Sequence, residues 1–387
     1  MLRVLTLSTL YPDALRPSFG PFVELQTCGL AAHPDVDLRL VVPWGTPPVI
    51  GRFIERYRAF YSLPWYEHRN DVTIYRVPFA HWPVIGARFD ATSLARSLRP
   101  VLKTLYSDWA FDVIDAEFFW PDGCAAIALG RELGVPVSIK ARGADIHYWG
   151  HNPSTAAQII AAGHAAGGLL AVSAALKADM VALGMPEDRI TVHYTGVDRG
   201  QFYVRDREAA KTAVGMSGPL LVSVGALIAR KRHAIVIEAM KQLPDTTLII
   251  VGEGPDRAAL EKQAAACGAR VRFLGSQPHD VIADWLAAAD AMVLMSASEG
   301  LANAWIEALA SGTPVIISDV GGAREIIDRP EAGVLSAADP VSVAGAITEV
   351  LKRNADRQAV AATVAHFSWE ANTAQLYDHL KAVAARR

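Results

Sequence analysis

Short apolar runs alternate with longer amphipathic segments along the whole chain, and this alternation restricts the fold more than any other feature. Apolar runs of about four to eight residues are typical of buried strands, and the segments between them are typical of helices. Strands that alternate with helices form parallel sheets with helices on both faces. We therefore predict an α/β fold with two doubly wound sheets. The predicted strands are 2–8, 37–42, 72–77, 111–115, 135–140 and 168–172 in the first half, and 220–224, 246–251, 271–274, 291–295 and 314–318 in the second.

The predicted boundary between the halves lies in residues 196–218. A chain of 387 residues has room for two packed domains. A Gly-Val-Asp turn, scattered charges and the stretch Gly215-Met216-Ser217-Gly218 interrupt the regular pattern there. We predict a first domain over 1–198, a second over 199–368, and an amphipathic helix over 369–385.

Composition excludes several classes of protein. Hydrophobic residues make up 51% of the chain and its formal net charge is −3, so we expect neither disorder nor a nucleic-acid partner. Three widely spaced cysteines fit neither a disulfide framework nor a zinc site, and we expect a reducing cytoplasm. The start of the chain reads as a first strand, not as a signal peptide, and no apolar run approaches the length of a membrane span.

A polar turn with one carboxylate follows the apolar run 291–295, and a second carboxylate lies eight residues further along. We predict that Glu299 lies in the turn, that Asn303 opens the next helix and that Glu307 lies about two turns further on. Ligands of open α/β sheets bind at the carboxyl ends of strands, so Glu299 can face a ligand's polar head. Two carboxylates near a helix start also compensate the helix dipole, and the spacing alone leaves both interpretations open.

Three consecutive cations follow the strand 220–224 and its glycine: Arg230, Lys231 and Arg232. A diphosphate needs such counter-charge, with arginine supplying a planar fork and lysine a point charge. The alternative is a solvated basic helix start. Cations there oppose the positive end of the helix dipole, so we expect the cluster to carry a local cost that a bound anion would remove.

Glycines follow two other strands. Gly321 and Gly322, after the strand 314–318, allow close backbone approach and free amide donors for an oxyanion, although a tight strand-to-helix connection needs the same glycines. Gly252 and Gly254 do not form a complete dinucleotide fingerprint, and we interpret them as a strand-ending turn.

The first half places ionisable groups at a strand end. Lys140, Arg142, Asp145 and His147 follow the strand 135–140, and the permanent cation Arg142 suits a phosphate-bearing acceptor or the donor diphosphate. His147 alone is equally consistent with packing or surface exposure. The loop 11–24, which contains Gly20, is punctuated by proline and glycine, as a plain strand-to-helix loop would also be.

Cations and aromatic residues are mixed over residues 52–66. Arg52, Arg56 and Arg58 alternate with aromatic side chains in a manner that fits a membrane-surface or lipid-acceptor contact. An aromatic-rich loop that packs on the first domain fits the same pattern.

Together these motifs resemble those of the family 4, or group 1, retaining glycosyltransferases. Residues 298–308 are similar to the family signature E-G-x-P-N-x-x-x-E-A, with Ala302 at the proline position. Residues 224–233 resemble V-G-R-L-x-x-x-K-G, with Lys231 at the lysine and Ala226 at the arginine position, and Arg230 is the neighbour able to supply the missing charge. Residues 272–275, 320–325, 142–145 and 120–123 resemble the family's F-L-G, S-D-V-G-G-x-x-E, R-G-x-D and P-D-G segments.

The resemblance implies a GT-B architecture, in which two Rossmann-like domains face a central cleft and a final helix, 369–387, completes the first domain. It implies transfer of a sugar from a nucleoside-diphosphate donor, UDP- or GDP-linked, to a glycan or lipid-linked hydroxyl with retained configuration, in surface polysaccharide or glycolipid synthesis. Neither a metal nor a cofactor is expected. An epimerase of nucleoside-diphosphate sugars and a non-catalytic nucleotide- or carbohydrate-binding protein remain as alternatives.

Site residues follow from the same resemblance. We expect Glu299, Lys231 and Arg142 to be catalytic. The expected acceptor-side residues are Asp122, Arg142 and Asp145. The expected donor-binding residues are Gly20, Arg230, Lys231, Gly275, Glu299, Gly300, Leu301, Ala302, Asn303, Glu307, Gly321 and Gly322.

Overall fold

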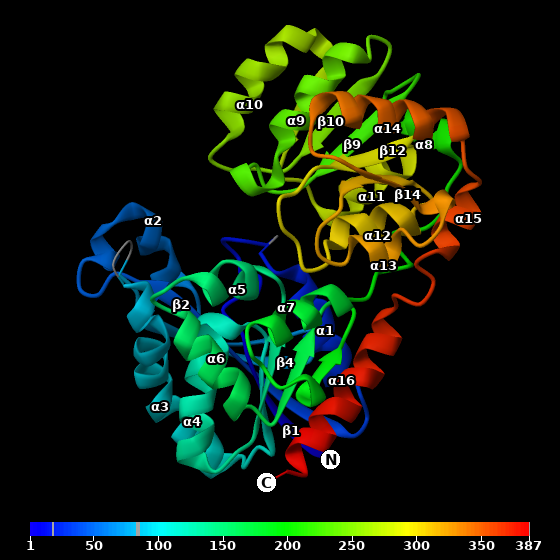
Figure 1. Cartoon of the computed structure of the whole chain (residues 1–387). Helices are drawn as coiled ribbons and strands as arrows, with labels where there is room; N and C mark the ends of the chain where they lie inside the picture. The colour runs from blue at the N-terminus through cyan, green and yellow to red at the C-terminus, as the bar shows by residue number, and fades with distance from the viewer. Residues whose placement is uncertain (18, 83–85, 387) are drawn as a thin grey trace. The chain divides into compact units, whose positions relative to one another are not determined.

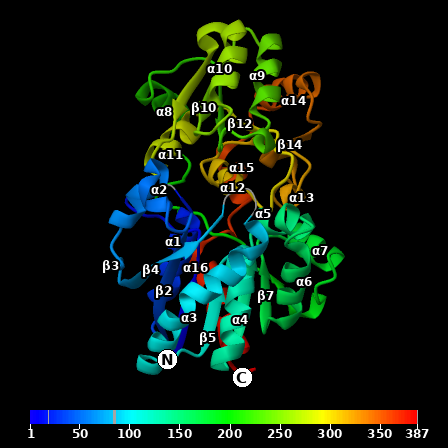
Figure 2. The same cartoon turned by 90° about the vertical axis from the view of Figure 1, so that its left-hand side faces the viewer.

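The computed structural model describes residues 1–17, 19–82 and 86–386, with only the backbone for Arg56 and Ala269. Ser18, in the predicted first loop, and the Arg56 side chain thus lie outside what is described. The chain forms two compact units, shown in Figures 1 and 2. The N-terminal unit comprises Met1–Gly196 and Trp369–Arg387, and the C-terminal unit comprises Val197–Ser368. The predicted boundary after residue 198 lies two residues from the observed one.

The N-terminal unit is built on an eight-stranded sheet in the order β3-β4-β2-β1-β5-β6-β7-β8. Its pairs are parallel except that β3 runs antiparallel to β4 at the edge. The strands are β1 (Leu2–Leu7), β2 (Val36–Thr46), β3 (Tyr66–Arg69), β4 (Val72–Ala80), β5 (Val113–Ala116), β6 (Val137–Ala141), β7 (Gly168–Ala171) and β8 (Ile190–Val192).

Helices cover both faces of this sheet (Figure 1). α1 (Pro21–Ala31) and α16 (Trp369–Ala384) pack together on one face, and α3 (Asp90–Asp108), α4 (Cys124–Leu133) and α6 (Ala156–Ala165) cover the other. α3 buries Leu94, Leu98, Leu102 and Leu105, whose spacing of three and four residues forms one apolar stripe. The shorter helices are α2 (Glu55–Arg58), α5 (Ala144–His147) and α7 (Ala174–Ala182), the last capped by Ser173.

α16 belongs to the N-terminal unit because its apolar face completes that core. Leu376, Leu380 and Val383 are buried in the same cluster as Val4 and Leu40. Each such side chain contributes roughly 1.5–3 kcal/mol when it leaves water. The predicted helix over 369–385 is therefore confirmed to within one residue at its end.

The C-terminal unit contains a six-stranded parallel sheet in the order β11-β10-β9-β12-β13-β14. α9, α10 and α14 lie on one face, and α8, α11, α12 and α15 lie on the other. The strands are β9 (Leu220–Val224), β10 (Thr247–Val251), β11 (Val271–Gly275), β12 (Ala291–Leu294), β13 (Val315–Ser318) and β14 (Gly333–Ser336). The helices are α8 (Arg207–Ala213), α9 (His233–Ala239), α10 (Arg257–Ala264), α11 (His279–Ala288), α12 (Asn303–Ala310), α13 (Ala323–Ile326), α14 (Pro340–Arg353) and α15 (Arg357–Ala362).

All predicted strands are present, and the prediction of two parallel α/β domains is confirmed. The prediction missed β3, β8 and β14. β3 is a half-exposed antiparallel edge strand, and β8 has only three residues, so neither shows a continuous apolar run.

Both sheets reverse their strand order at one place. In the N-terminal unit β1 lies between β2 and β5, and in the C-terminal unit β9 lies between β10 and β12. Chain connections leave such a pair of central strands in opposite directions, which opens a crevice at their carboxyl ends. The fold therefore marks the loops after β1 and β5, and after β9 and β12, as the ligand-binding edges.

Gly333, the first residue of β14, lies very close to the backbone of β13. Its φ is 140°, and a Cβ there would lie 1.8 Å from the carbonyl oxygen of Val315. We expect Gly333→Ala to lower the free energy of unfolding by about 2 kcal/mol or more, because both strain and a backbone clash arise. Gly345→Ala is the matched control: it lies within α14, exposed and with open space around it, and should gain about 0.5–1 kcal/mol. Urea denaturation measures both, and equal effects would contradict the prediction.

Candidate active site

Two loops meet at the strand-order reversal of the C-terminal unit. Arg230 and Lys231 lie in a short 3-10 turn, Ala229–Lys231, after β9, and Glu299 lies between β12 and α12. The Lys231 Nζ is 2.6 Å from Glu299 Oε1, and an Arg230 guanidinium nitrogen is 3.3 Å from Oε2. The backbone ties the same loops together, because the amide of Ala297 donates to the Arg230 carbonyl at 2.8 Å. The sheet thus brings together three residues predicted from separate motifs.

The charges of this cluster are balanced internally. The Glu299 side chain is only 9% exposed. Burial by itself raises the pKa of Glu299, but the charges of Lys231 and Arg230 outweigh it and hold that pKa below its ordinary value. The expectation that these cations carry a local cost until an anion binds needs correction, since Glu299 already supplies their counter-charge.

The glycines after β13 make room for the Glu299 loop. A Cβ on Gly321, whose φ is 52°, would lie 2.1 Å from the Glu299 carbonyl oxygen. The amide of Gly322 donates to the Gly300 carbonyl at 2.8 Å. The predicted close approach is therefore present, but its partner is protein backbone, and the Gly322 amide is engaged instead of free for an oxyanion.

The remaining donor-side residues line the start of α12. The helix begins at Asn303, as predicted, while Leu301 and Ala302 before it are buried. Glu307 lies one turn after Asn303, not two, because residues 299–302 are loop. Glu307 is half-buried, and burial raises its pKa to about 7. In the part of the chain that is described, no hydrogen bond or ion pair reaches its carboxylate.

Gly275 ends β11 beside the glycine turn of β10. Its carbonyl accepts from the Gly252 amide at 2.8 Å, and its own φ is 74°. A Cβ on Gly252 would lie 2.0 Å from the Gly225 carbonyl oxygen. The interpretation of Gly252 and Gly254 as a strand-ending turn fits this packing.

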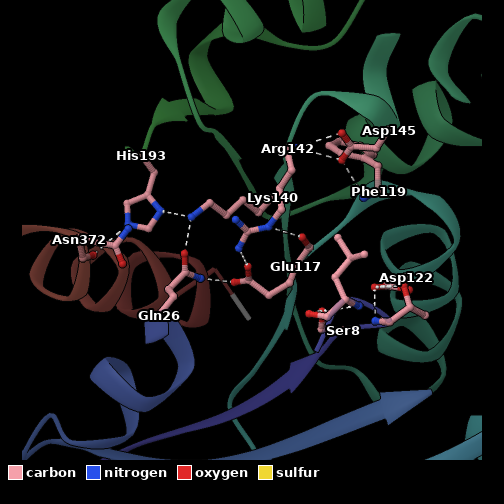
Figure 3. A network of polar contacts seen from close by, with 12 residues as sticks. Ser8, Gln26, Glu117, Phe119, Asp122, Lys140, Arg142, Asp145, His193 and Asn372 are labelled. Carbon is pink, nitrogen blue, oxygen red and sulfur yellow. Dashed lines mark hydrogen bonds and ion pairs between the residues drawn. The ribbon is translucent and has the colours of Figure 1, made fainter. Parts of the chain in front are cut away.

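A buried ion pair occupies the strand ends of the N-terminal unit (Figure 3). Arg142, after β6, is ion-paired through its guanidinium to the carboxylate of Glu117, after β5, and its Nε donates to the Glu117 carbonyl at 2.9 Å. Burial raises the pKa of Glu117, but Arg142 and Lys140 outweigh it, so the net pKa is lowered. Sequence reasoning missed Glu117, although it lies two residues beyond the predicted strand 111–115.

The pair continues into a chain of buried polar groups that reaches α16 (Figure 3). Gln26 bridges Glu117 and Lys140, and the Lys140 Nζ lies 2.8 Å from His193 Nδ1. His193 Nε2 lies 2.9 Å from the Asn372 carbonyl oxygen. A carbonyl only accepts, so Nε2 carries the proton and Nδ1 accepts from Lys140. Burial lowers the pKa of Lys140 to about 7. Burial and the charge of Lys140 together hold the pKa of His193 well below its ordinary value.

Asp145 and Asp122 fix loops in this structure. Asp145 accepts from the amides of Arg142, Gly143 and Phe119 at 2.8–3.2 Å. Asp122 accepts from the amide and hydroxyl of Thr9 at 2.8 and 3.1 Å, and burial raises its pKa to about 7. Both residues are fully buried. Direct contact of either carboxylate with an acceptor stays a prediction.

Gly20 has a local steric role. Its φ is 72°, and a Cβ there would lie 2.8 Å from the Leu10 carbonyl oxygen. The loop after β1 therefore needs a glycine at the start of α1 whether or not a phosphate approaches it.

The basic and aromatic segment after β2 is partly packed and partly exposed. Phe60 and Tyr61 contact Trp44, with ring centroids 5.6 and 4.9 Å away. Val49 and Phe53 are each 79% exposed. Exposed Arg52 and Arg58 lie in the same segment. Both interpretations of the segment thus have structural counterparts.

The described residues contain neither a membrane-spanning helix nor a cluster of metal-ligating side chains. No helix there is long and apolar enough to cross a bilayer. No group of three histidine, cysteine, aspartate or glutamate side chains is placed there to hold a metal ion.

Two Rossmann-like parallel-sheet units in one chain are the architecture of the GT-B fold, and solved structures with that fold match over the full length. Sucrose-phosphate synthase from Thermosynechococcus elongatus superposes with a TM-score of 0.84 at 20% identity, covering 100% of both chains. HepE of Anabaena, solved in complex with UDP, gives 0.74 at 18% identity, covering 98% of this chain and 100% of its own. These likenesses show the fold.

The chain belongs to the group 1 glycosyltransferases. The family model for glycosyl transferases group 1 matches residues 204–367, and that for glycosyltransferase family 4 matches residues 51–201. TuaC of Bacillus subtilis, a glycosyltransferase assigned to teichuronic acid biosynthesis, is 29% identical over 358 residues, 90% of this chain and 88% of the relative. A D-inositol 3-phosphate glycosyltransferase of Mycobacterium marinum is 33% identical over 48% of this chain and 43% of its own.

The raised pKa of Glu307 predicts that the free energy of unfolding depends on pH. Its pKa is raised from 4.5 to about 7 in the folded state, so between these values the folded state holds a proton that the unfolded state has lost. Stability contributed by this group falls as pH rises from 4.5 through 7. We expect Glu307→Gln to be more stable than the parent by about 1–3 kcal/mol at pH 8 and equal to it at pH 4.

Urea denaturation at both pH values measures this difference. Asp245→Asn, at an exposed carboxylate of the same unit, is the control and should give the same small change at both. A Glu307→Gln effect that does not vary with pH would contradict the assignment of a buried protonated carboxyl.

Proposed function

We propose that this glycosyltransferase transfers a sugar from a UDP- or GDP-linked donor to a glycan or lipid-linked hydroxyl, with retention of configuration and without a metal. The observation that carries the proposal is the cluster of Lys231, Arg230 and Glu299 at the strand-order reversal of the C-terminal sheet. It puts two cations and one ionised carboxylate at the edge where such sheets bind nucleotides.

The donor diphosphate would replace Glu299 as the partner of the two cations. Lys231 and Arg230 then stabilise the negative charge that grows on the leaving diphosphate. Their release from Glu299 leaves its oxygens to accept hydrogen bonds from sugar hydroxyls and to orient the anomeric carbon. Glu307, one turn into α12, is proposed to hold the ribose. Arg230 takes the place of the family arginine that Ala226 replaces, since it reaches Glu299 from the adjacent turn.

The chemistry proposed is substitution on one face of the sugar. The bond from the anomeric carbon to the diphosphate oxygen breaks, the acceptor oxygen attacks from the same side, and a phosphate oxygen takes the acceptor proton. This scheme needs positioned charges and no covalent nucleophile. Lys231 and Arg230 lie 2.6 and 3.3 Å from the Glu299 carboxylate, and these two positive charges support charge stabilisation without a metal.

Relatives support the choice of donor and pathway. HepE is described in complexes with UDP and with UDP-glucose. TuaC is assigned to teichuronic acid, a polymer, and LpsE of Rhizobium meliloti is assigned to lipopolysaccharide core biosynthesis. We propose by analogy that this chain acts in the synthesis of a surface polysaccharide or glycolipid.

Substitutions of Lys231 and Glu299 are expected to affect nucleotide binding and donor turnover differently. We expect UDP or GDP to raise the melting temperature of the parent and Lys231→Ala to lose that rise, because a point charge on the diphosphate is removed. Glu299→Gln should keep nucleotide binding and lose turnover of the matching sugar donor by about 10²–10³-fold. Thermal denaturation and nucleotide release, each repeated with EDTA, measure these effects, and Lys262→Ala, an exposed lysine of the same unit, is the control.

Other outcomes identify the rival functions. Release of nucleotide with a new sugar epimer, in the absence of an acceptor, would identify an epimerase. Nucleotide binding with no turnover of any donor would identify a binding protein. Loss of activity in EDTA would contradict the metal-independent scheme, and inversion at the anomeric carbon of the product would contradict retention.

We also propose that the N-terminal unit contacts the cytoplasmic face of a membrane through residues 49–58. Apolar Val49 and Phe53 are exposed beside exposed Arg52 and Arg58, a combination that inserts apolar side chains while cations meet anionic headgroups. This contact fits a lipid-linked acceptor.

Vesicle flotation tests the membrane contact. Arg52→Glu with Arg58→Glu should reduce flotation with vesicles that contain anionic lipid about tenfold, because each basic residue near such a surface is worth about 1 kcal/mol. Lys241→Glu with Lys262→Glu makes the same charge change on the C-terminal unit and should leave flotation unchanged. Equal flotation of all three proteins would refute the contact.

A further inference from the structure

A large cavity of the N-terminal unit opens at the carboxyl ends of four neighbouring strands. It has a volume of about 600 Å³. Thr9 follows β1, Trp44 lies near the end of β2, His81 follows β4 and Trp120 follows β5, and all four residues line it. These strands are consecutive in the sheet, in the order β4-β2-β1-β5. The cavity therefore spans the strand-order reversal, where this type of sheet binds ligands.

Aromatic side chains form much of the wall. Aromatic rings present flat apolar faces, and the C–H face of a pyranose ring is flat and apolar in the same way, while its hydroxyls point outward. A pocket that combines such rings with a few hydrogen-bonding groups suits a sugar. The aromatic residues of the wall, besides His81, are Phe19, Trp44, Tyr57, Phe60, Phe79, Trp120 and Trp149.

His81 is one fixed polar group of the wall, which Arg16 also lines. Its Nδ1 lies 3.0 Å from both carboxylate oxygens of Asp90, which is buried. A carboxylate accepts, so His81 donates from Nδ1, and in the neutral imidazole its Nε2 is the hydrogen-bond acceptor. The His81 side chain is 34% exposed, so this acceptor is held at an oriented and accessible position. A hydroxyl is the matching donor.

A second cavity adjoins the first through two shared residues. It has a volume of about 640 Å³ and is also lined by His81 and Trp149. Tyr148 and Asn152 complete part of its wall, and Tyr148 is 62% exposed with its ring 4.8 Å from that of Trp149. His81 and Trp149 thus stand between two cavities, each large enough for a sugar ring.

We propose that the two cavities form one acceptor site for a glycan of at least two sugar rings, with His81 Nε2 accepting a hydrogen bond from a hydroxyl near the linkage. The inference deepens the proposed function and rests on it, because it assigns the acceptor class. An aliphatic lipid tail would desolvate the His81–Asp90 pair and Asn152 without returning a hydrogen bond, which is unfavourable for each group. A saccharide can pack on the aromatic rings of the walls and form hydrogen bonds with their polar groups.

Saturation-transfer difference NMR with a panel of methyl hexopyranosides and the corresponding disaccharides tests the site in the full chain. We expect at least one disaccharide to bind more tightly than its component monosaccharides. His81→Gln, which loses the acceptor nitrogen, and Tyr148→Ala, an exposed position that should not disturb folding, are each expected to weaken binding about tenfold. Trp65→Leu, an exposed aromatic residue of the same unit outside both cavities, is the control and should bind as the parent does.

Three results would overturn the proposal: no saccharide of the panel binds, binding is unchanged in both variants, or farnesyl phosphate displaces the disaccharide and loses affinity in the same variants. The last result assigns the cavities to a lipid. The thermal shift with UDP and GDP is measured on every protein. Without that shift in the parent the proposed function fails, whereas a retained shift with no saccharide binding removes only the assignment of the acceptor.

Discussion

Burial of both faces of each sheet is the constraint on which the rest of the molecule depends. The central strands are mostly apolar and buried, as β9, β12 and β13 show, so few polar side chains lie along them. Polar residues gather in the loops at the carboxyl ends. Strand order then decides which loops become neighbours. The reversal brings Lys231 beside Glu299 in one unit, and the adjacency of β5 and β6 brings Glu117 beside Arg142 in the other.

Both units offset the cost of a buried charge in the same way, because Glu299 and Glu117 each pair with cations from a neighbouring strand end. The two clusters differ in what surrounds them. Glu299 keeps a little exposure beside an accessible arginine, which allows a ligand to exchange partners with it. Glu117 is fully enclosed, and its network of Gln26, Lys140 and His193 holds elements together. Similar electrostatics thus serve the proposed ligand binding in one place and hold elements together in the other.

The sequence was sufficient to predict the two sheets and the start of α12 at Asn303, because each depends on a local pattern. It did not show that Lys231 and Glu299 touch, since 68 residues separate them and strand order alone makes them neighbours. Glu117, Gln26 and His193 were missed for the same reason. Their hydrogen-bond partners lie far away in the chain, and no local spacing in the sequence indicates these contacts. Gly321 shows the predicted close backbone approach, whereas the Gly322 amide has a partner, the Gly300 carbonyl, that depends on the fold.

The placement of α16 in the N-terminal core has a consequence for the order in which the chain folds during synthesis. Leu376, Leu380 and Val383 close a core whose other members begin at Val4, and His193 bonds to the backbone of Asn372. The ribosome must therefore translate the whole C-terminal unit before the N-terminal core is complete. The C-terminal unit is therefore fully synthesised before the N-terminal unit. Until α16 is synthesised, the apolar surface that it covers stays exposed, and a chaperone can bind there.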